Sequence, residues 1–98
     1  MNNRNRNSDP ANELYRALLT LKTTEECYQF FLDLCTQAEM KAMEQRFDVA
    51  KMLRSGSIYH DILTETSASS ATISRVNRSL LNGSGGYEMV FSRLEEKK

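Results

Sequence analysis

The stretch from Ser69 to Gly83 carries a complete signal for one short helix, with a start, a stop and two unlike faces. Ser69 is placed to cap the amide groups of the first turn, and we expect Gly83 to end the helix in the left-handed conformation. Ile73, Val76 and Leu80 follow the spacing i, i+3, i+7, which gives the helix an apolar stripe. The remaining side chains are small, hydroxylated or basic. The stretch therefore predicts a helix that packs through one face and closely approaches a groove through the other.

The region around this helix has a positive formal charge, although the chain as a whole has equal numbers of basic and acidic residues. The protein has 13 basic and 13 acidic residues, yet residues 66–87 include Arg75 and Arg78 and no acidic residue. A surface that faces phosphate needs such an asymmetry. An ordinary solvated helix face is the alternative, and two arginines do not exclude it.

Length and composition predict a single all-helical domain. The chain has 98 residues with one proline and four glycines, and helix-forming residues are frequent. No apolar run approaches the roughly 20 residues that cross a bilayer, and no signal segment opens the chain. We therefore expect a soluble, cytoplasmic protein without membrane contact. Residues 1–8 are polar and are expected to form a disordered arm. A solvated tail is favoured over an arm that contacts DNA. Residues 9–98 are expected to form the folded domain.

Further helices are predicted on both sides of the stretch from Ser69 to Gly83. Residues 58–65 are predicted to form a short helix capped by Ser57, with Ile58, Ile62 and Leu63 facing inward. A last amphipathic helix is expected after a flexible glycine-rich segment at residues 83–86. The earlier signals are Ser8 or Asp9 as the cap before Pro10, the capping box Thr23–Glu26 ahead of core residues Cys27, Phe30, Phe31 and Leu34, and the capping box Thr36–Glu39 of a longer helix that stops at Gly56.

The short helix that ends near residue 65 and the helix that Ser69 caps are joined by a tight connection at residues 66–68. Ile62 and Leu63 before it, with Ile73 and Val76 after it, are spaced to lock the two helices together. Short helices, a tight turn and an apolar lock predict a helix-turn-helix, whose second helix enters the major groove of DNA. Such a turn prefers glycine where this chain has Ser67, and serine adopts the left-handed conformation only at some cost.

Residues with catalytic or metal-binding chemistry are too few and too scattered for a site. Cys27 and Cys35 lack a neighbouring histidine, so buried free thiols are a better interpretation than a disulfide or a zinc site. His60 is the sole histidine, and neither paired carboxylates nor a phosphate-binding loop accompany it. We expect no catalytic residue, no metal and no cofactor, and hence no enzyme.

Six parts of the chain carry a family resemblance: Glu25–Tyr28, Asp33–Cys35, Arg46, Ala50–Arg54, Ala71–Val76 and Ser79–Leu80. They resemble the tryptophan repressor superfamily, especially its YerC/YecD-type relatives. The likeness runs from about Leu14 to Leu94 and implies a six-helix fold and an intertwined homodimer. The dimer would hold its two recognition helices roughly 34 Å apart, one turn of duplex.

The resemblance also implies an effector pocket with one departure from the tryptophan repressor. Thr36, Arg46, Arg75 and Ser79 correspond to positions around the corepressor, and paired guanidinium groups suit a carboxylate and a flat ring. The tryptophan repressor has glycine directly after the second arginine, whereas this chain has Val76. A branched side chain should fill the slot for the indole ring. We therefore expect no tryptophan binding.

Short side chains at the start of the predicted recognition helix are the candidates for reading double-stranded DNA. None of them makes the two-pronged contact that discriminates bases strongly, so specificity should depend on water bridges and DNA shape. A dimeric transcriptional regulator is the leading hypothesis, and a repressor is favoured because a dimer that blocks the groove needs no further domain. A dimer that acts through protein contacts, or a sensor that holds a smaller anionic effector between Arg46 and Arg75, are the alternatives. The reading candidates are Ser69, Ser70, Ala71, Thr72 and Ser74, with Arg78 and Arg54 assigned to phosphate.

Overall fold

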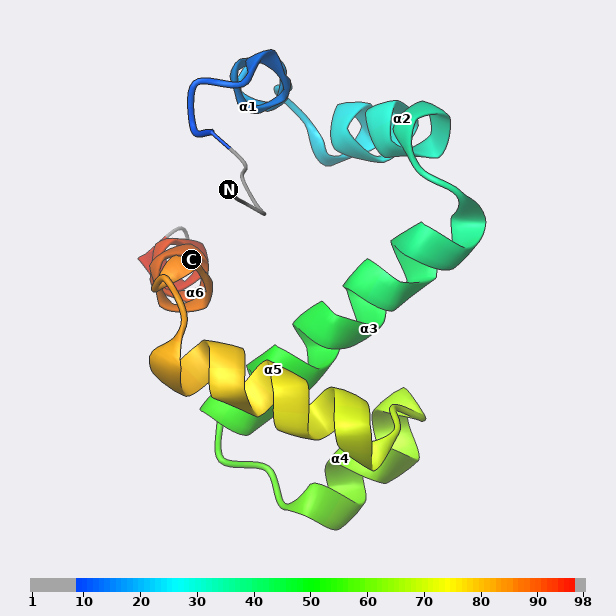
Figure 1. The fold of residues 1–98 in the computed structure, drawn as a ribbon, viewed down its shortest axis with the longest axis vertical. Coiled ribbons are helices and arrows are strands. Elements are labelled where there is room, and N and C mark those ends of the chain that lie inside the picture. Colours follow the sequence, from blue (N-terminus) through cyan, green and yellow to red (C-terminus); the bar gives the residue numbers. More distant parts are fainter. Residues whose placement is uncertain (1–8, 97–98) are drawn as a thin grey trace, which may run out of the picture. The chain divides into compact units, whose positions relative to one another are not determined.

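Helix signals in the sequence correspond to helices in the computed structural model, which describes residues 9–96. The described chain is all-helical, with six helices in the expected order and no strand (Figure 1). It divides into an N-terminal unit that ends at Gln37 and a C-terminal unit that begins at Ala38. The expected arm, residues 1–8, lies outside the described residues. The helices are α1 (Glu13–Leu18), α2 (Thr24–Leu34), α3 (Gln37–Arg54), α4 (Tyr59–Thr66), α5 (Ser70–Asn82) and α6 (Gly86–Glu96).

Helix α1 begins later than the sequence signals predicted. The Asn12 side chain caps it by accepting a hydrogen bond from the backbone N–H of Leu14 at 2.9 Å. Asp9 instead holds a turn, because its carboxylate accepts from the N–H of Ala11 and its carbonyl from the N–H of Asn12, both at 2.9 Å. The prediction of an Asp9 cap was therefore wrong, and Ser8 lies outside the described residues.

Helix α2 starts at the predicted cap but its apolar face is not a core. The Thr23 side chain accepts a hydrogen bond from the N–H of Glu26 at 3.1 Å, which confirms the start. No residue of α1 or α2 is buried. Cys27 is exposed, Phe30 is only partly buried and Leu34 is 49% exposed. None of the predicted core positions of α2 is therefore buried in the single chain. Both thiols are free, but the expectation that they are buried was wrong, since Cys27 is exposed and Cys35 is only partly buried.

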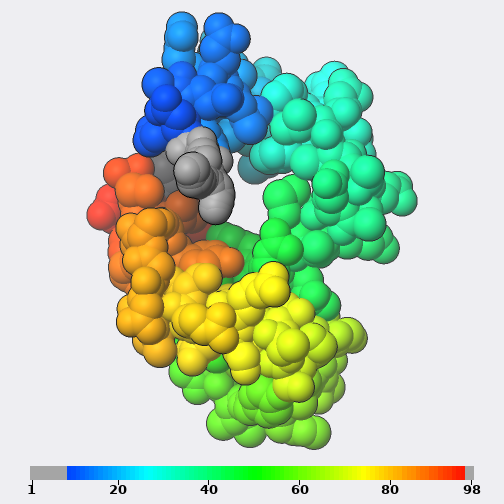
Figure 2. All heavy atoms as spheres, viewed as in Figure 1, coloured from blue at the N-terminus to red at the C-terminus, as the bar shows by residue number. Residues whose placement is uncertain are grey.

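The core lies in the C-terminal unit, where α3, α4, α5 and α6 each contribute to it. Phe91 of α6 packs on Phe47 of α3 with ring centroids 5.0 Å apart, and partly buried side chains surround the cluster. Figure 2 shows the atoms of α4 and α5 lying against each other within this unit. The buried cluster consists of Val49, Ala50, Ile62, Ala68, Ile73, Val76 and Phe91.

The chain leaves α3 through a turn that requires glycine and then enters α4 without a side-chain cap. Gly56 has a φ of +86°, and the N–H groups of Gly56 and Ser57 bond back to the carbonyls of Leu53 and Met52 at 3.1 and 2.9 Å. This pattern is a Schellman ending, and it confirms the predicted stop. Ser57 does not cap α4, because Ile58 is the N-cap and makes no side-chain cap bond. Ile58 was expected inside but is 64% exposed.

None of the helices in residues 9–96 is long and apolar enough to cross a membrane.

Candidate nucleic-acid interface

The connection between α4 and α5 is built around a serine in a left-handed conformation. Ser67 has a φ of 58° and a ψ of 17°, and its N–H bonds to the carbonyl of Leu63 at 3.0 Å. The Thr66 hydroxyl donates to the carbonyl of Ile62 at 2.7 Å and accepts from the N–H of Ala68 at 3.1 Å. The tight turn expected at residues 66–68 is confirmed, including the conformation for which glycine is the usual residue.

The predicted apolar lock holds this helix pair together. Ile62, Ile73 and Val76 are at most 3% exposed, and Leu63 packs against the same cluster. Because these side chains face the core, the opposite face of α5 turns outward. The buried stripe of α5 thus determines which of its side chains are available to a partner.

The outward face of α5 carries hydroxyl and guanidinium groups. Ser70, Ala71, Ser74, Arg75 and Arg78 are exposed. With no acidic residue at positions 66–87, the face has only positive formal charge. It is therefore chemically suited to an anionic partner, as the sequence indicated.

Ser69 and Thr72 are bonded to each other at the start of this face. Ser69 is the N-cap, and its hydroxyl oxygen accepts from the N–H of Thr72 at 3.1 Å. The same hydroxyl donates to the Thr72 hydroxyl oxygen at 3.1 Å. The predicted cap is confirmed, and it leaves the Thr72 hydroxyl proton as the donor that this pair can offer outward.

Gly83 ends α5, although not in the left-handed conformation that we expected. Its φ of −85° and ψ of −154° are extended, and its N–H bonds to the carbonyl of Ser79 at 2.9 Å. A Cβ atom at this position would overlap the same Ser79 carbonyl oxygen. The glycine is thus required by close approach of the backbone, and the predicted reason was wrong.

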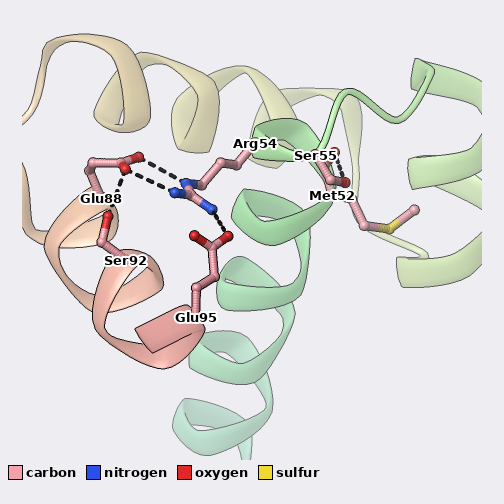
Figure 3. A network of polar contacts seen from close by, with 6 residues as sticks. All are labelled: Met52, Arg54, Ser55, Glu88, Ser92 and Glu95. Carbon is pink, nitrogen blue, oxygen red and sulfur yellow. Dashed lines mark hydrogen bonds and ion pairs between the residues drawn. The ribbon is translucent and has the colours of Figure 1, made fainter. Parts of the chain in front are cut away.

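Arg54 faces α6 and is held there by two carboxylates (Figure 3). Its Nε and Nη2 bond to Glu88 at 2.8 and 2.9 Å, and its Nη1 bonds to Glu95 at 2.7 Å. The guanidinium also lies 5.5 Å from the centre of the Phe91 ring, and Ser92 donates to Glu88 at 2.9 Å. We call this set the Arg54 clamp.

The clamp shifts the ionisation of its members. Hydrogen bonds from Arg54 and then from Ser92 lower the pKa of Glu88 to about 2. The bonds to Glu88 and Glu95 raise the pKa of Arg54 above its already high ordinary value. The sequence did not indicate the clamp, because its partners lie 34 and 41 residues further along the chain. A guanidinium engaged in this way already has its anionic partners, so Arg54 differs from Arg78 as a phosphate candidate.

The structure distributes the expected effector residues over different surroundings. Arg46 is partly buried on α3, Arg75 is exposed, and Val76 is 2% exposed within the core. Thr36 belongs to the N-terminal unit. Ser79 lines an apolar groove of about 450 Å³, whose other lining residues are Phe47, Gly83, Ser84, Gly86, Tyr87, Met89 and Val90.

Sequence reasoning missed one polar residue beside the turn. The Gln45 side chain of α3 donates from Nε2 to the carbonyl oxygen of Thr66 at 3.0 Å in a partly buried position. A glutamine within a helix ordinarily indicates a solvated face, so the sequence held no signal for this contact. Over residues 9–96, no group of His, Cys, Asp and Glu side chains is arranged to hold a metal ion.

These features define a class of small all-helical protein in which an exposed, basic helix follows a tight turn. The chain belongs to the Trp repressor protein family, whose family model matches residues 10–95.

Relatives of known sequence and structure agree with this assignment. The chain is 54% identical over 84 residues to the uncharacterised protein YerC of Bacillus subtilis, covering 86% of this chain and 81% of YerC. It matches the crystal structure of a proposed Trp repressor from Staphylococcus aureus with a TM-score of 0.83, 51% identity and coverage of 86% and 84% of the two chains. A TrpR-like protein from Eubacterium eligens gives a TM-score of 0.82, 54% identity and coverage of 85% and 86%. The resemblance noted in the sequence is therefore confirmed.

Proposed function

We propose that this protein is a sequence-specific DNA-binding transcriptional regulator that acts as a homodimer, most simply as a repressor. In this proposal α4 and α5 form a helix-turn-helix, and α5 enters the major groove. The observation that carries the proposal is the outward face of α5, which is exposed, hydroxylated and free of acidic residues over positions 66–87. The family assignment supports it, because the family model is that of the Trp repressor protein.

The proposed contacts follow from the exposure of each side chain and from the hydrogen-bonding groups that it does not already use within the chain. Ser70, Ala71 and Ser74 are exposed and short, so the helix can approach the base edges closely. Thr72 offers a donor, since its oxygen already accepts from Ser69. Arg78 is assigned to phosphate, and Arg54 is left out because the clamp holds it. Specificity then depends on water bridges and DNA shape.

Uncovered apolar side chains in both units support a homodimer. Leu19 in the N-terminal unit is 86% exposed and Leu81 in the C-terminal unit is 70% exposed. Apolar surface that is left exposed in the single chain is often covered by a partner. We propose that a second copy of the chain covers it. The large apolar side chains left exposed are Tyr15, Leu19, Tyr28, Leu32, Leu34, Ile58, Tyr59, Leu81, Met89, Val90 and Leu94.

We further propose that tryptophan is not the corepressor. Val76 lies in the core cluster. The resemblance places it where the tryptophan repressor has glycine, so in this proposal its branched side chain fills the slot for the indole ring. The turn and the start of α5 are already held by Ser69, Thr66 and the core, so ordering by a ligand is not needed. A different small anionic effector between Arg46 and Arg75, or a dimer that acts through protein contacts, are the alternatives.

In vitro selection of genomic DNA fragments tests the proposal. The purified full-length protein is mixed with sheared genomic DNA at about 150 mM salt, where non-specific attraction is weak. We expect recovered fragments to share an inverted repeat, and we expect added tryptophan to leave the recovery unchanged. Recovery that depends on tryptophan would overturn the corepressor proposal. Recovery of nothing above background, with or without small anions, would overturn the DNA-binding proposal and favour a protein partner.

A further inference from the structure

The amide of Gln45 connects α3 to the turn that precedes the exposed helix. Its Nε2 donates to the carbonyl oxygen of Thr66 across 21 positions of sequence at 3.0 Å. Gln45 and Thr66 are both partly buried, and both belong to the C-terminal unit. The contact therefore joins the helix that forms the scaffold of this unit to the α4–α5 pair.

The Thr66 carbonyl needs a partner from outside its own helix. Thr66 is the last residue of α4, so no backbone N–H of the same helix is available to donate a hydrogen bond to its carbonyl. The left-handed Ser67 turns the chain away, and the N–H of Ala68 bonds to the Thr66 hydroxyl instead. A partly buried carbonyl without a donor is unfavourable, so Gln45 supplies what the turn cannot.

The apolar contacts between these elements fix their orientation less narrowly than a hydrogen bond between defined atoms does. Val49 and Ala50 of α3 and Ile62 and Ile73 of the helix pair belong to one buried cluster, but apolar burial is non-directional. A hydrogen bond between defined atoms is directional. The Gln45 bond thus restricts how far the α4–α5 pair can rotate on α3.

We propose that Gln45 is a positioning residue that sets the angle at which α5 meets DNA. This inference rests on the proposed DNA-binding function. The helix from Ser70 to Arg78 is about 12 Å long, so a tilt of about 5° moves its far end by about 1 Å. That displacement exceeds the range of about 0.5 Å over which hydrogen-bond lengths vary. Loss of the Gln45 bond should therefore weaken contacts that require exact geometry and spare general attraction to phosphate.

The test compares Gln45→Met with Thr64→Val. Methionine keeps the length of the side chain and removes the donor. Thr64→Val removes a bond of similar kind on α4, from the Thr64 hydroxyl to the carbonyl of His60 at 2.9 Å, which does not reach α3. Dissociation constants are measured for the full chain on a duplex with the selected inverted repeat and on a scrambled duplex of equal length. All proteins are first shown to be folded at the assay temperature.

We expect Gln45→Met to bind the inverted repeat about tenfold more weakly, as one mismatched base pair would, and to bind the scrambled duplex unchanged. Thr64→Val should bind both duplexes like the unaltered protein. Gln45→Lys places a donor at this position again, so it should recover the preference for the inverted repeat over the scrambled duplex. Gln45→Glu has no donor when ionised and should not recover that preference. The Lys and Glu variants decide the matter if Gln45→Met fails to fold.

Each contrary result has a distinct meaning. Equal losses on both duplexes, or unchanged discrimination in Gln45→Met and Gln45→Glu, would overturn the positioning role and leave the proposed function intact. If the unaltered protein does not distinguish the duplexes, the proposed function fails and this inference fails with it.

Discussion

Ser67 has a conformation that glycine adopts more easily. L-residues with a side chain pay for a positive φ, and the φ of Ser67 is 58°. Ser67→Gly should raise the free energy of unfolding by about 0.5–1 kcal/mol, since relief of strain exceeds the added freedom of the unfolded chain. Urea unfolding measures this as a higher midpoint with an unchanged slope. As a control, Ser74→Gly within α5 should lower the midpoint, and a Ser67→Gly protein that unfolds earlier would contradict the strain argument.

Arg78 is the basic residue of the exposed α5 face that we assign to phosphate. Arg78→Ala should weaken binding to every DNA sequence and reduce the slope of log affinity against log salt by about one. Arg93→Ala is the matched control, because Arg93 is also exposed but lies on α6. Fluorescence anisotropy with two unrelated duplexes over a salt series provides the measurement. A loss confined to one of the duplexes would instead assign Arg78 to a base.

Individual residues were predictable where the chemistry is local. Ser69 and Thr23 were identified as caps because each bonds to an amide three residues along the chain. Ser67 was identified because the turn imposes its conformation. Gln45 and Arg54 were not, since their partners lie 21 or more residues away and only the folded chain brings them together.

The Arg54 clamp attaches α6 to the end of α3. Because Arg54 lowers the pKa of Glu88 from its ordinary 4.5 to about 2, the ionised carboxylate favours the folded state. This contribution is present above the unfolded pKa and is lost as pH falls from 4.5 towards 2. Glu88 and Glu95 are exposed and Arg54 is partly exposed, so salt should screen the effect.

Glu88→Gln tests this pH dependence. The thermal midpoint of the variant should lie below that of the unaltered protein at about pH 7, and the difference should shrink as pH falls through the window above. Glu96→Gln, on the same helix, serves as the control and should show little difference at any pH. A constant difference between Glu88→Gln and the unaltered protein down to pH 2 would mean that the charge of Glu88 is not responsible.

Helix boundaries were predicted less well than helix order. The start of α1 moved to Asn12 because Asp9 closes a turn of its own, and Ser57 is used in the ending of α3 instead of as a cap for α4. Both are cases in which two local motifs compete for the same residue. At Gly83 the correct residue was chosen for the wrong reason, since contact with the backbone of Ser79 decides it.

The fold as a whole was predictable from the sequence because its helix signals and its resemblance to the Trp repressor family cover nearly the same residues. The burial of the N-terminal unit was not, because a periodic apolar face indicates that a helix has a partner and does not say which chain supplies it. Phe30 and Leu34 illustrate the point, since both occupy core-like positions and neither is buried in the single chain.

A dimer makes a prediction for the intact protein. Sedimentation equilibrium should give twice the chain mass of 11.2 kDa at micromolar concentration. The thermal midpoint should rise with protein concentration, because association stabilises the folded state by mass action. A mass of one chain with a midpoint independent of concentration would contradict the homodimer and require another partner for the exposed apolar side chains.

The ring contact of Phe47 with Phe91 and the Arg54 clamp together join α3, which precedes the helix pair in the chain, to α6, which follows it. In polymer terms, α4 and α5 form a closed loop whose two ends are fastened to each other, with Arg54 and Glu88 separated by 34 positions. Closing such a loop has an entropic cost that is already met before α5 touches anything. A different helix pair could therefore be grafted between α3 and α6 without opening this closure, provided that it also supplied apolar side chains in place of Ile62, Ala68, Ile73 and Val76, which belong to the shared core.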